Sequence, residues 1–400
     1  PHFVFYVKSL LEKEYGERRV QEGGLRVYTT LDFSLQASAQ KILSEELESL
    51  KGYDVGNGAV LVTRPSTGEI LAMVGSRNFF DGSFGAFNVT TALRQPGSSI
   101  KPFTYTLALK EGMTAATLVN DTPTKFDIAG SAPYQPVNYD GKYHGLVSLR
   151  YALANSYNIP AVLLLRQVGV EDLVSFAQKL GLSDWENQKD RFGLSLTLGG
   201  GEINMIDFAT AYGALRNLGV RHDTYPIQRI ENSVGSVLFE QDTSGTRVMR
   251  EEEPFIVSDM LADNIARSAA FGQNSAINFV DKYVSVKTGT TDEKRDNWTV
   301  GYTRPTLNSK VTDLLVIVWV GNNDNRSMNQ GLVSGITGAA PIWRRIMEAA
   351  VNKELFNEDL YIPESIVSKQ CYFGRQEYFV IGTEGTVNCQ GLKPSTTPKE

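Results

Sequence analysis

The segment from Arg94 to Phe103, with the sequence RQPGSSIKPF, constrains the fold more than any other part of this chain. A Pro-Gly turn precedes Ser98, and Pro102 directly follows Lys101. Because proline is tolerated only in the first turn of a helix, where backbone N–H groups are unpaired anyway, the segment predicts a helix that begins close to Ser98. Side chains three residues apart share one helix face, so Lys101 is expected beside the Ser98 hydroxyl.

The start of a helix is a suitable place for a nucleophilic serine. Its free N–H groups and the positive end of its dipole favour the oxyanion that forms when a hydroxyl attacks a carbonyl, and a neighbouring base activates that hydroxyl. The Ser-x-x-Lys spacing alone is not specific, because Ser38 and Lys41 share it inside a predicted helical run. The alternative for Ser98 is a helix cap followed by a surface lysine. The segment by itself favours neither interpretation.

Two further short motifs follow in the chain. Residues 156–158 have the sequence Ser-Tyr-Asn, and residues 287–289 have the sequence Lys-Thr-Gly at the end of a predicted strand. Pro160 disfavours helix at Ile159, so the first of these motifs is predicted at a turn between two helices. Ser-x-Asn also occurs at 76–78 and 327–329, but only the copy at 156 lies between the other two motifs. Three motifs in this order favour a functional interpretation over a plain cap.

Together with their neighbours, these motifs resemble those of the penicillin-binding proteins, the serine transpeptidases of peptidoglycan synthesis. RQPGSSIKP is similar to the family's nucleophile segment, ALANSYNIPA at 152–161 to its second motif, and KTGTT at 287–291 with the following DNW at 296–298 to its third. The resemblance covers roughly residues 25–350 and is strongest to the bifunctional class A members. Those carry a glycosyltransferase domain and a membrane anchor ahead of this region, both expected to be absent here.

The resemblance implies a catalytic role for four residues. Ser98 attacks the carbonyl between the two terminal D-alanines of a stem peptide and forms an acyl-enzyme. A neutral Lys101 takes its proton, and the neighbouring cation of Lys287 lowers the pKa of Lys101. Ser156 relays a proton to the departing D-alanine. β-Lactams, which mimic the D-Ala-D-Ala end, are expected to acylate Ser98 and stay bound.

Four more residues are expected to bind the substrate. Asn158 hydrogen-bonds the substrate amide and orients Lys101, while Thr288 and Thr290 bind the terminal carboxylate. Gly289 lets the peptide lie close to the strand as an added β-strand. The backbone N–H groups of Ser98 and Thr290 form the oxyanion hole. The amine of a second stem peptide then completes the cross-link.

The order of the predicted elements indicates an α+β fold with an antiparallel sheet flanked by helices. Strand patterns cover 59–62 and 70–74, helical patterns dominate from about 113 to 275, and strand patterns return at 283–290, 298–302 and 313–320. We expect a linker segment at 1–56, a transpeptidase domain at 57–351 and a C-terminal appendage at 352–400, disordered from Lys393.

Composition excludes several other classes of function. The net charge of −6 and the lack of a dense basic stripe argue against nucleic-acid binding. Only three histidines occur, none with metal-ligand spacing, so no metal and no cofactor are expected. Cys371 and Cys389 favour a disulfide in an oxidising compartment. Trp298 and Tyr302 are expected in the core, and His144 as a structural histidine.

Hydrolases of the same superfamily are the main rivals. A serine β-lactamase with all three motifs also needs a deacylating glutamate, usually in a Glu-x-x-Leu-Asn loop between the second and third motifs, and no such sequence occurs. A DD-carboxypeptidase, which admits water in place of the amine, stays open, as does a β-lactam sensor that acylates once. The resemblance also implies a full-length protein at the extracytoplasmic face of the bacterial cytoplasmic membrane, acting with other cell-wall synthesis proteins.

Overall fold

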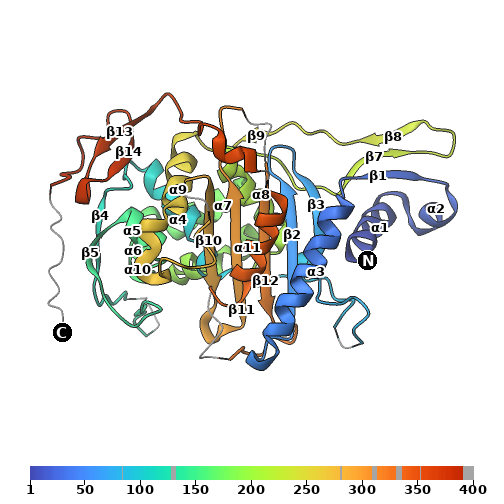
Figure 1. Cartoon of the computed structure of the whole chain (residues 1–400), viewed down its shortest axis with the longest axis horizontal. Helices are drawn as coiled ribbons and strands as arrows, with labels where there is room; N and C mark the ends of the chain where they lie inside the picture. The colour runs from blue at the N-terminus through green and yellow to red at the C-terminus, as the bar shows by residue number, and fades with distance from the viewer. Residues whose placement is uncertain are drawn as a thin grey trace.

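The computed structural model describes residues 1–82, 84–127, 132–279, 282–308, 313–329, 336–351 and 353–390. The predicted disorder from Lys393 onward therefore lies outside the described residues. Figure 1 shows the centre of the molecule as a single sheet, with helices in front of it and behind it.

The central sheet is antiparallel throughout and joins strands from the two ends of the chain. Its order is β10 (Val284–Thr290), β11 (Asp296–Thr303), β12 (Leu315–Gly321), β2 (Asn57–Arg64) and β3 (Glu69–Val74). β2 and β3 form the predicted hairpin, and β12 pairs with β2 with Leu315 opposite Thr63. This confirms the predicted α+β fold, in which segments far apart in sequence close the sheet.

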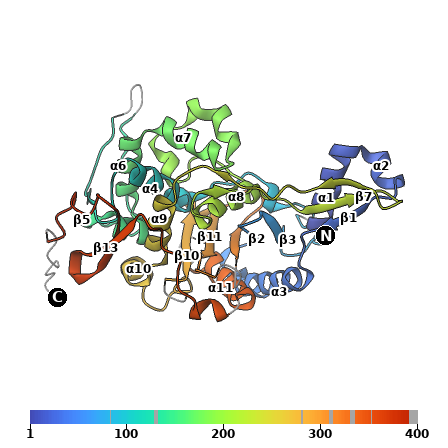
Figure 2. The ribbon, with the colours of Figure 1, turned by 90° about the horizontal axis from the view of Figure 1, so that it is seen from above.

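Both faces of the sheet are buried, as the strand patterns require. On β12, Leu315, Ile317 and Trp319 point into one core, and the alternating residues Val316, Val318 and Val320 point into another. The second core is closed by α3 (Phe33–Ser49) and α11 (Ala339–Ala350), which Figure 2 shows on the same side of the sheet. Asp32 caps α3 as predicted, since its side chain accepts a hydrogen bond from the Leu35 N–H.

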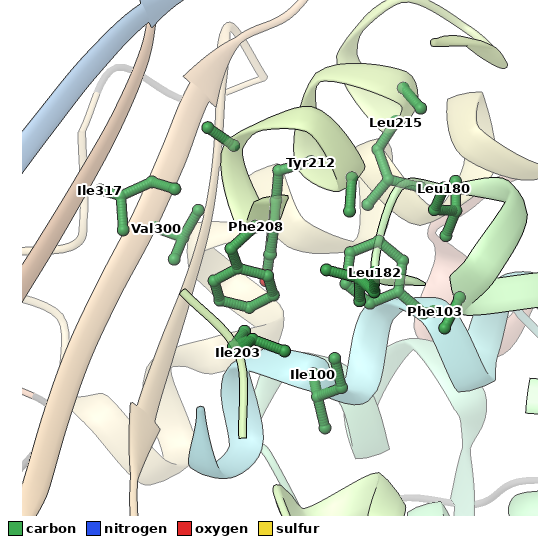
Figure 3. Close-up of a cluster of buried hydrophobic side chains, with 14 of the residues drawn as sticks. Ile100, Phe103, Leu180, Leu182, Ile203, Phe208, Tyr212, Leu215, Val300 and Ile317 are labelled. Atoms are coloured by element: carbon green, nitrogen blue, oxygen red, sulfur yellow. The ribbon is translucent and has the colours of Figure 1, made fainter. Parts of the chain in front are cut away.

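The opposite face carries the helices that position the motifs. They are α4 (Lys101–Lys110), α5 (Leu149–Ala154), α6 (Asn158–Val168), α7 (Val170–Lys179), α8 (Met205–Arg216), α9 (Glu252–Ala262) and α10 (Asn264–Phe271). Figure 3 shows how α4 is fixed in this layer, with Ile100 and Phe103 beside Phe208 and Tyr212 of α8. The rings of Phe103 and Tyr212 meet edge to face, with centroids 5.3 Å apart.

The prediction that residues 113–275 are mainly helical is wrong for one hairpin. β7 (Ile227–Glu231) and β8 (Val237–Glu240) form a hairpin that extends away from the central sheet. β7 also pairs with β1 (Arg26–Thr29), beside the opening helices α1 (His2–Tyr15) and α2 (Glu17–Glu22). The β7 sequence IQRIE has no apolar–polar alternation, and its partner β1 lies about two hundred residues earlier, so no local pattern indicates the strand. Shorter strand pairs, β4 (Leu118–Asp121) with β5 (Gly145–Ser148) and β6 (Val220–Arg221) with β9 (Thr246–Arg247), were also missed.

The opening segment, which we predicted to be a linker, packs against the rest of the described fold. β1 pairs with a hairpin from the middle of the chain, and α3 covers the central sheet. The predicted boundaries at 56 and 351 stay predictions.

The last described residues form a small unit that is attached to the helical layer. β13 (Ile366–Gln370) and β14 (Gln376–Val380) form a hairpin, and the favoured disulfide joins Cys371 to Cys389. Glu377 of β14 pairs with the guanidinium of Arg150, which also contacts Asp259 and Asp263 and is only 3% exposed. Because α5 carries Arg150 and leads into the Ser-Tyr-Asn motif, this charge cluster ties the appendage to the wall of the candidate site.

Arg150→Gln should destabilise the protein by about 3–5 kcal/mol, because it leaves the buried Glu377 carboxylate without its cation, while Asp259 and Asp263 keep Arg304 and Arg375. Urea or thermal unfolding measures the change. Arg18→Gln is the matched control: its pair with Glu22 is exposed and should contribute less than about 1 kcal/mol. Equal losses in the two variants would contradict the assignment.

Candidate active site

Ser98 lies at the start of a helix, as the sequence predicted. Residues Gly97–Ile100 form a short 3₁₀ turn that continues directly into α4, and Pro102 occupies the first turn of α4. The Ser98 side chain is half-buried, whereas Lys101 on the next turn is fully buried. The predicted helix start is confirmed.

Three glycines bring the Ser98 turn against strand β10. A Cβ on Gly97 would lie 2.7 Å from the Thr290 carbonyl oxygen, and one on Gly289 would lie within 3.0 Å of the Pro96 carbonyl and of Ser99. Gly199 meets Gly97 in the same way, at a φ of +99°. No side chain fits in these contacts, so backbone touches backbone on both sides of the Ser98 turn. The glycine of the third motif thus packs against the nucleophile segment, a contact that the sequence analysis did not foresee.

Trp298 fixes the same segment from the sheet. Its ring is buried in the core, as predicted, and its indole N–H donates a hydrogen bond to the Gln95 carbonyl at 2.8 Å. A core residue of β11 therefore holds the approach to Ser98 in place.

The Lys101 ammonium is held entirely by the second motif. It donates to the Ser156 carbonyl at 2.6 Å, the Asn158 Oδ1 at 2.7 Å, the Tyr157 carbonyl at 3.1 Å and the Ser156 hydroxyl at 3.4 Å. None of the described hydrogen bonds joins Lys101 to Ser98. Burial, and then the nearby Lys287 ammonium, lower the pKa of Lys101 well below its usual value. The lowered pKa favours the neutral form of Lys101.

The Ser156 hydroxyl lies between two lysines. Lys287 Nζ approaches it at 2.8 Å and Lys101 Nζ at 3.4 Å. Ser156 has a positive φ of 60°, an uncommon conformation for a residue other than glycine, and such residues cluster at functional sites. Burial, and then the charge of Arg267, lower the pKa of Lys287 to about 7. Arg267 on α10 was not singled out from the sequence, since nothing local connects it with Lys287.

Asn158 is the first residue of α6 and links the site to the connection between β4 and β5. Its side-chain N–H donates to the Val137 carbonyl at 2.7 Å, and its backbone N–H donates to Asn138 Oδ1 at 2.7 Å. The expectation that Pro160 keeps Ile159 out of the helix is wrong, because α6 begins at Asn158 and Pro160 falls in its first turn, where proline is tolerated.

His144 packs against the second motif. Its Nδ1 lies 2.6 Å from Asp121 and its ring stacks on Tyr157 at 3.9 Å. Its ring nitrogens are both within hydrogen-bond distance of carboxylates, the second being that of Asp140 at 3.2 Å. The prediction of a structural histidine agrees with this arrangement.

The third motif lies on the edge of the central sheet. Strand β10 pairs with β11 alone among the described strands, so its other edge is available to an added peptide strand. Thr288 is buried next to Lys287, and Thr290 is half-buried and accepts a hydrogen bond from Asn297 at 3.2 Å. The described residues contain no group of three or more histidine, cysteine, aspartate or glutamate side chains that could hold a metal ion.

The site thus gathers the eight predicted residues from three distant segments. Two buried lysines with lowered pKa values contact one serine hydroxyl, and a second serine stands at a helix start beside the edge strand β10. This arrangement is suited to acyl transfer through a serine.

Comparison with known proteins agrees with this geometry. Residues 58–348 match the family model "Penicillin binding protein transpeptidase domain". The chain is 33% identical over 349 residues to penicillin-binding protein 1A of Aquifex aeolicus and 31% identical over 420 residues to penicillin-binding protein 2D of Bacillus subtilis. These matches cover 84% and 100% of this chain but 45% and 58% of the relatives, so the chain spans about half their length.

Solved structures show the same fold. The crystal structure of penicillin-binding protein 1A from Haemophilus influenzae superposes with a TM-score of 0.82 at 22% identity, covering 96% of this chain and 76% of that one. PonA1 from Mycobacterium tuberculosis in complex with penicillin V gives a TM-score of 0.74 at 24% identity, covering 91% and 96%.

The chain therefore belongs to the transpeptidase domain family of the penicillin-binding proteins. Within that family, its relatives place it with the class A members, as the motif neighbourhoods had suggested.

Gly289→Ala should destabilise the protein by about 1–3 kcal/mol, because the new methyl group has no room beside Pro96 and Ser99. Chemical denaturation measures the change. Gly193→Ala is the control, since a Cβ there meets nothing within 4 Å and its φ of −128° suits alanine. If both variants are equally stable, the contact between the third motif and the nucleophile segment is wrong.

The lowered pKa of Lys287 should make stability depend on pH. The unfolded lysine keeps its proton up to its usual pKa of 10.5, while the folded one loses it above about 7. The unfolded state thus binds more protons in this window, so the free energy of unfolding should rise with pH, by up to about 1.4 kcal/mol per pH unit. Chemical denaturation of wild type and of Lys287→Met over this pH range measures the contribution of Lys287 to the slope. An identical slope in both proteins would contradict the lowered pKa of Lys287.

Proposed function

We propose that this chain is a serine-type D-Ala-D-Ala transpeptidase that cross-links peptidoglycan stem peptides through an acyl-enzyme on Ser98. The observation that carries the proposal is the Ser156 hydroxyl held between two buried lysines, beside the helix start that presents Ser98. Ser98, Lys101, Ser156 and Lys287 have the catalytic roles, and Asn158, Thr288, Gly289 and Thr290 bind the substrate.

Acylation starts with a proton transfer. Neutral Lys101 takes the Ser98 proton, the oxygen bonds to the carbonyl carbon of the penultimate D-alanine, and the negative charge moves to the carbonyl oxygen. The backbone N–H groups of Ser98 and Thr290 stabilise that oxyanion. The lowered pKa of Lys101 supports this role, because an ordinary surface lysine is protonated at neutral pH.

Collapse of the tetrahedral intermediate breaks the bond to the terminal D-alanine. Ser156 gives its proton to the departing amine and is reprotonated from the lysines, which lie 2.8 and 3.4 Å from its hydroxyl. The terminal carboxylate is bound by Thr288 and Thr290 at the strand edge, where the positive charge of Lys287 is also available. The pKa of about 7 lets Lys287 exchange its proton during the cycle.

The second half of the reaction decides between related activities. An amine of another stem peptide attacks the acyl carbonyl, forms the cross-link and frees Ser98. Attack by water in its place makes a DD-carboxypeptidase, and no attack makes a β-lactam sensor. We favour the transpeptidase because the curated relatives are penicillin-binding proteins of the class A type.

β-Lactams are proposed as covalent inhibitors that acylate Ser98, in line with the penicillin V complex of the PonA1 neighbour. We further propose that the full-length protein acts at the extracytoplasmic face of the bacterial cytoplasmic membrane with other cell-wall synthesis proteins. Among the helices that the structure describes, none combines the length and apolar character that a membrane span needs.

A fluorescent penicillin should label the wild-type chain covalently, and Ser98→Ala should remove the label. Ser38→Ala is the matched control, because Ser38 and Lys41 have the same spacing within α3, far from the three motifs in the sequence, and should play no part. Gel fluorescence after denaturation measures both. Persistent labelling of Ser98→Ala would refute the nucleophile assignment. Released D-alanine without cross-linked product, in the presence of an acceptor amine, would assign a carboxypeptidase instead.

A further inference from the structure

Helix α10 is held against the second motif by the side chain of Asn155, the residue before Ser156. Asn155 is buried, and its Oδ1 accepts a hydrogen bond from the Ala270 N–H at 2.9 Å. Its side-chain N–H groups donate to the Ala266 carbonyl at 2.8 Å and to the Tyr151 carbonyl at 2.9 Å. Because this buried amide is bonded to both α5 and α10, it fixes the position of α10 relative to the second motif.

Arg267 of α10 is a buried cation. The residue is only 2% exposed, and its guanidinium donates to the Asp263 carbonyl at 3.3 Å, to the Ile277 carbonyl at 3.5 Å and to the Leu261 carbonyl. Leu261 lies in the last turn of α9, so the guanidinium is held at the negative end of that helix dipole. An arginine is not deprotonated in a protein interior, and Arg267 therefore brings a permanent positive charge into the core.

Arg267 and Lys287 line the same small cavity, which has a volume of about 10 Å³. Most of its other lining residues are apolar, among them Leu153, Phe271, Ile277 and Val286. The space holds about one water molecule at most, so solvent screens the two charges from each other only weakly. Burial, and then the charge of Arg267, lower the pKa of Lys287 to about 7.

Lys287 also faces charged groups on the other elements packed around it. From α4, Lys101 approaches the same serine hydroxyl, and the charge of Asp121 acts on Lys101. On β11, the residue opposite Lys287 is the apolar Val300. The carboxylates at the end of α9 are paired with other cations, namely Asp259 with Arg150 and Arg304, and Asp263 with Arg150 and Arg375. Of all these groups, Arg267 has the charge that most affects Lys287.

We propose that Arg267 is a positioning residue for the transpeptidase reaction: its fixed charge repels the Lys287 ammonium and so drives a proton from that ammonium to Ser156, once Ser156 has protonated the departing D-alanine. The inference rests on the proposed function. In this step an N–H bond of Lys287 breaks, an O–H bond forms on Ser156, and the electron pair stays on the lysine nitrogen. The proton released when the acceptor amine attacks the acyl carbonyl then restores the Lys287 ammonium. Asn155 contributes by keeping α10, and with it Arg267, in place.

The pH dependence of stability tests the inference without catalysis. In the wild type, the free energy of unfolding should begin to rise with pH at about 7, where folded Lys287 loses its proton. Arg267→Gln removes the repelling charge, so the rise should begin about one pH unit higher, whereas Arg267→Lys keeps the charge and should keep the wild-type onset. Chemical denaturation between about pH 6 and pH 10 measures the onset.

Two controls separate the charge of Arg267 from its packing. Arg304→Gln removes another buried cation, one that pairs with Asp259, and should lower stability while leaving the onset at about 7. In a Lys287→Met background, Arg267→Gln should not change the pH dependence. An onset that stays at about 7 in Arg267→Gln, or a shift that persists without Lys287, would overturn the inference.

A second pair of variants keeps Arg267 and its contacts with the three carbonyls. Phe271 is half-buried at the end of α10 and lines the cavity, so Phe271→Glu adds a carboxylate there, and Phe271→Gln is its neutral match. Because the carboxylate offsets the charge of Arg267, the onset should lie at a higher pH in Phe271→Glu than in Phe271→Gln. Equal onsets in these two variants would contradict the inference even if Arg267→Gln does not fold.

The pH profile of acylation tests the role of Arg267 in the reaction. The rate of labelling by a fluorescent penicillin should fall above about pH 7 in the wild type, because Lys287 has then lost the proton that Ser156 needs. In Arg267→Gln the fall should begin about one pH unit higher, with a lower maximal rate, and Arg267→Lys should restore both. A rate lowered equally at every pH would assign Arg267 a purely structural role and overturn the inference. Wild-type protein that takes no label would count against the proposed function instead, since the unfolding experiment does not depend on catalysis.

Discussion

The rest of the site depends on two buried lysines that share one serine hydroxyl. Two ammonium groups this close, both out of water, cannot keep ordinary pKa values, because neither burial nor mutual repulsion tolerates two full charges. The protein resolves this by giving Lys101 four acceptors from residues 156–158 while lowering its pKa. The geometry of the second motif is therefore set by the needs of Lys101, and the positive φ of Ser156 is the conformational cost of that geometry.

Close backbone packing joins the three motifs into one site. The glycines at 97, 199 and 289 remove the side chains that would hold the Ser98 turn away from β10, and Trp298 anchors the preceding carbonyl. Each dispersion contact between the packed backbones is weak, but together the contacts leave the Ser98 turn little room to move. Such rigidity is what a nucleophile needs if its oxygen is to meet a carbonyl and two backbone donors at once.

The sequence was sufficient for the parts of this design that have a local signature. Pro96, Gly97 and Pro102 predicted the helix start, alternation predicted the central strands, and motif order brought together Ser98, Ser156 and Lys287. The sequence was insufficient where a residue's role depends on a contact with a distant part of the chain. Nothing near Arg267 indicates that its charge acts on Lys287, and Ile227–Glu231 forms a strand because β1 lies beside it. The prediction from Pro160 was wrong for a different reason. A proline disfavours helix at the preceding residue, but it is tolerated in the first turn of a helix, and Pro160 lies in the first turn of α6.

The pairing of β1 with β7 sets the minimum piece of this protein that can be handled on its own. The family match starts at residue 58, but a chain cut there loses β1 and α3 together. β7 would then present an unpaired edge to solvent, a common route to intermolecular strand addition. One face of the central sheet would also lose half of its cover. The domain defined by the family match is therefore smaller than the unit needed for folding without exposed strand edges. A shortened version of the protein should keep both strands of each pair, including β1 with β7.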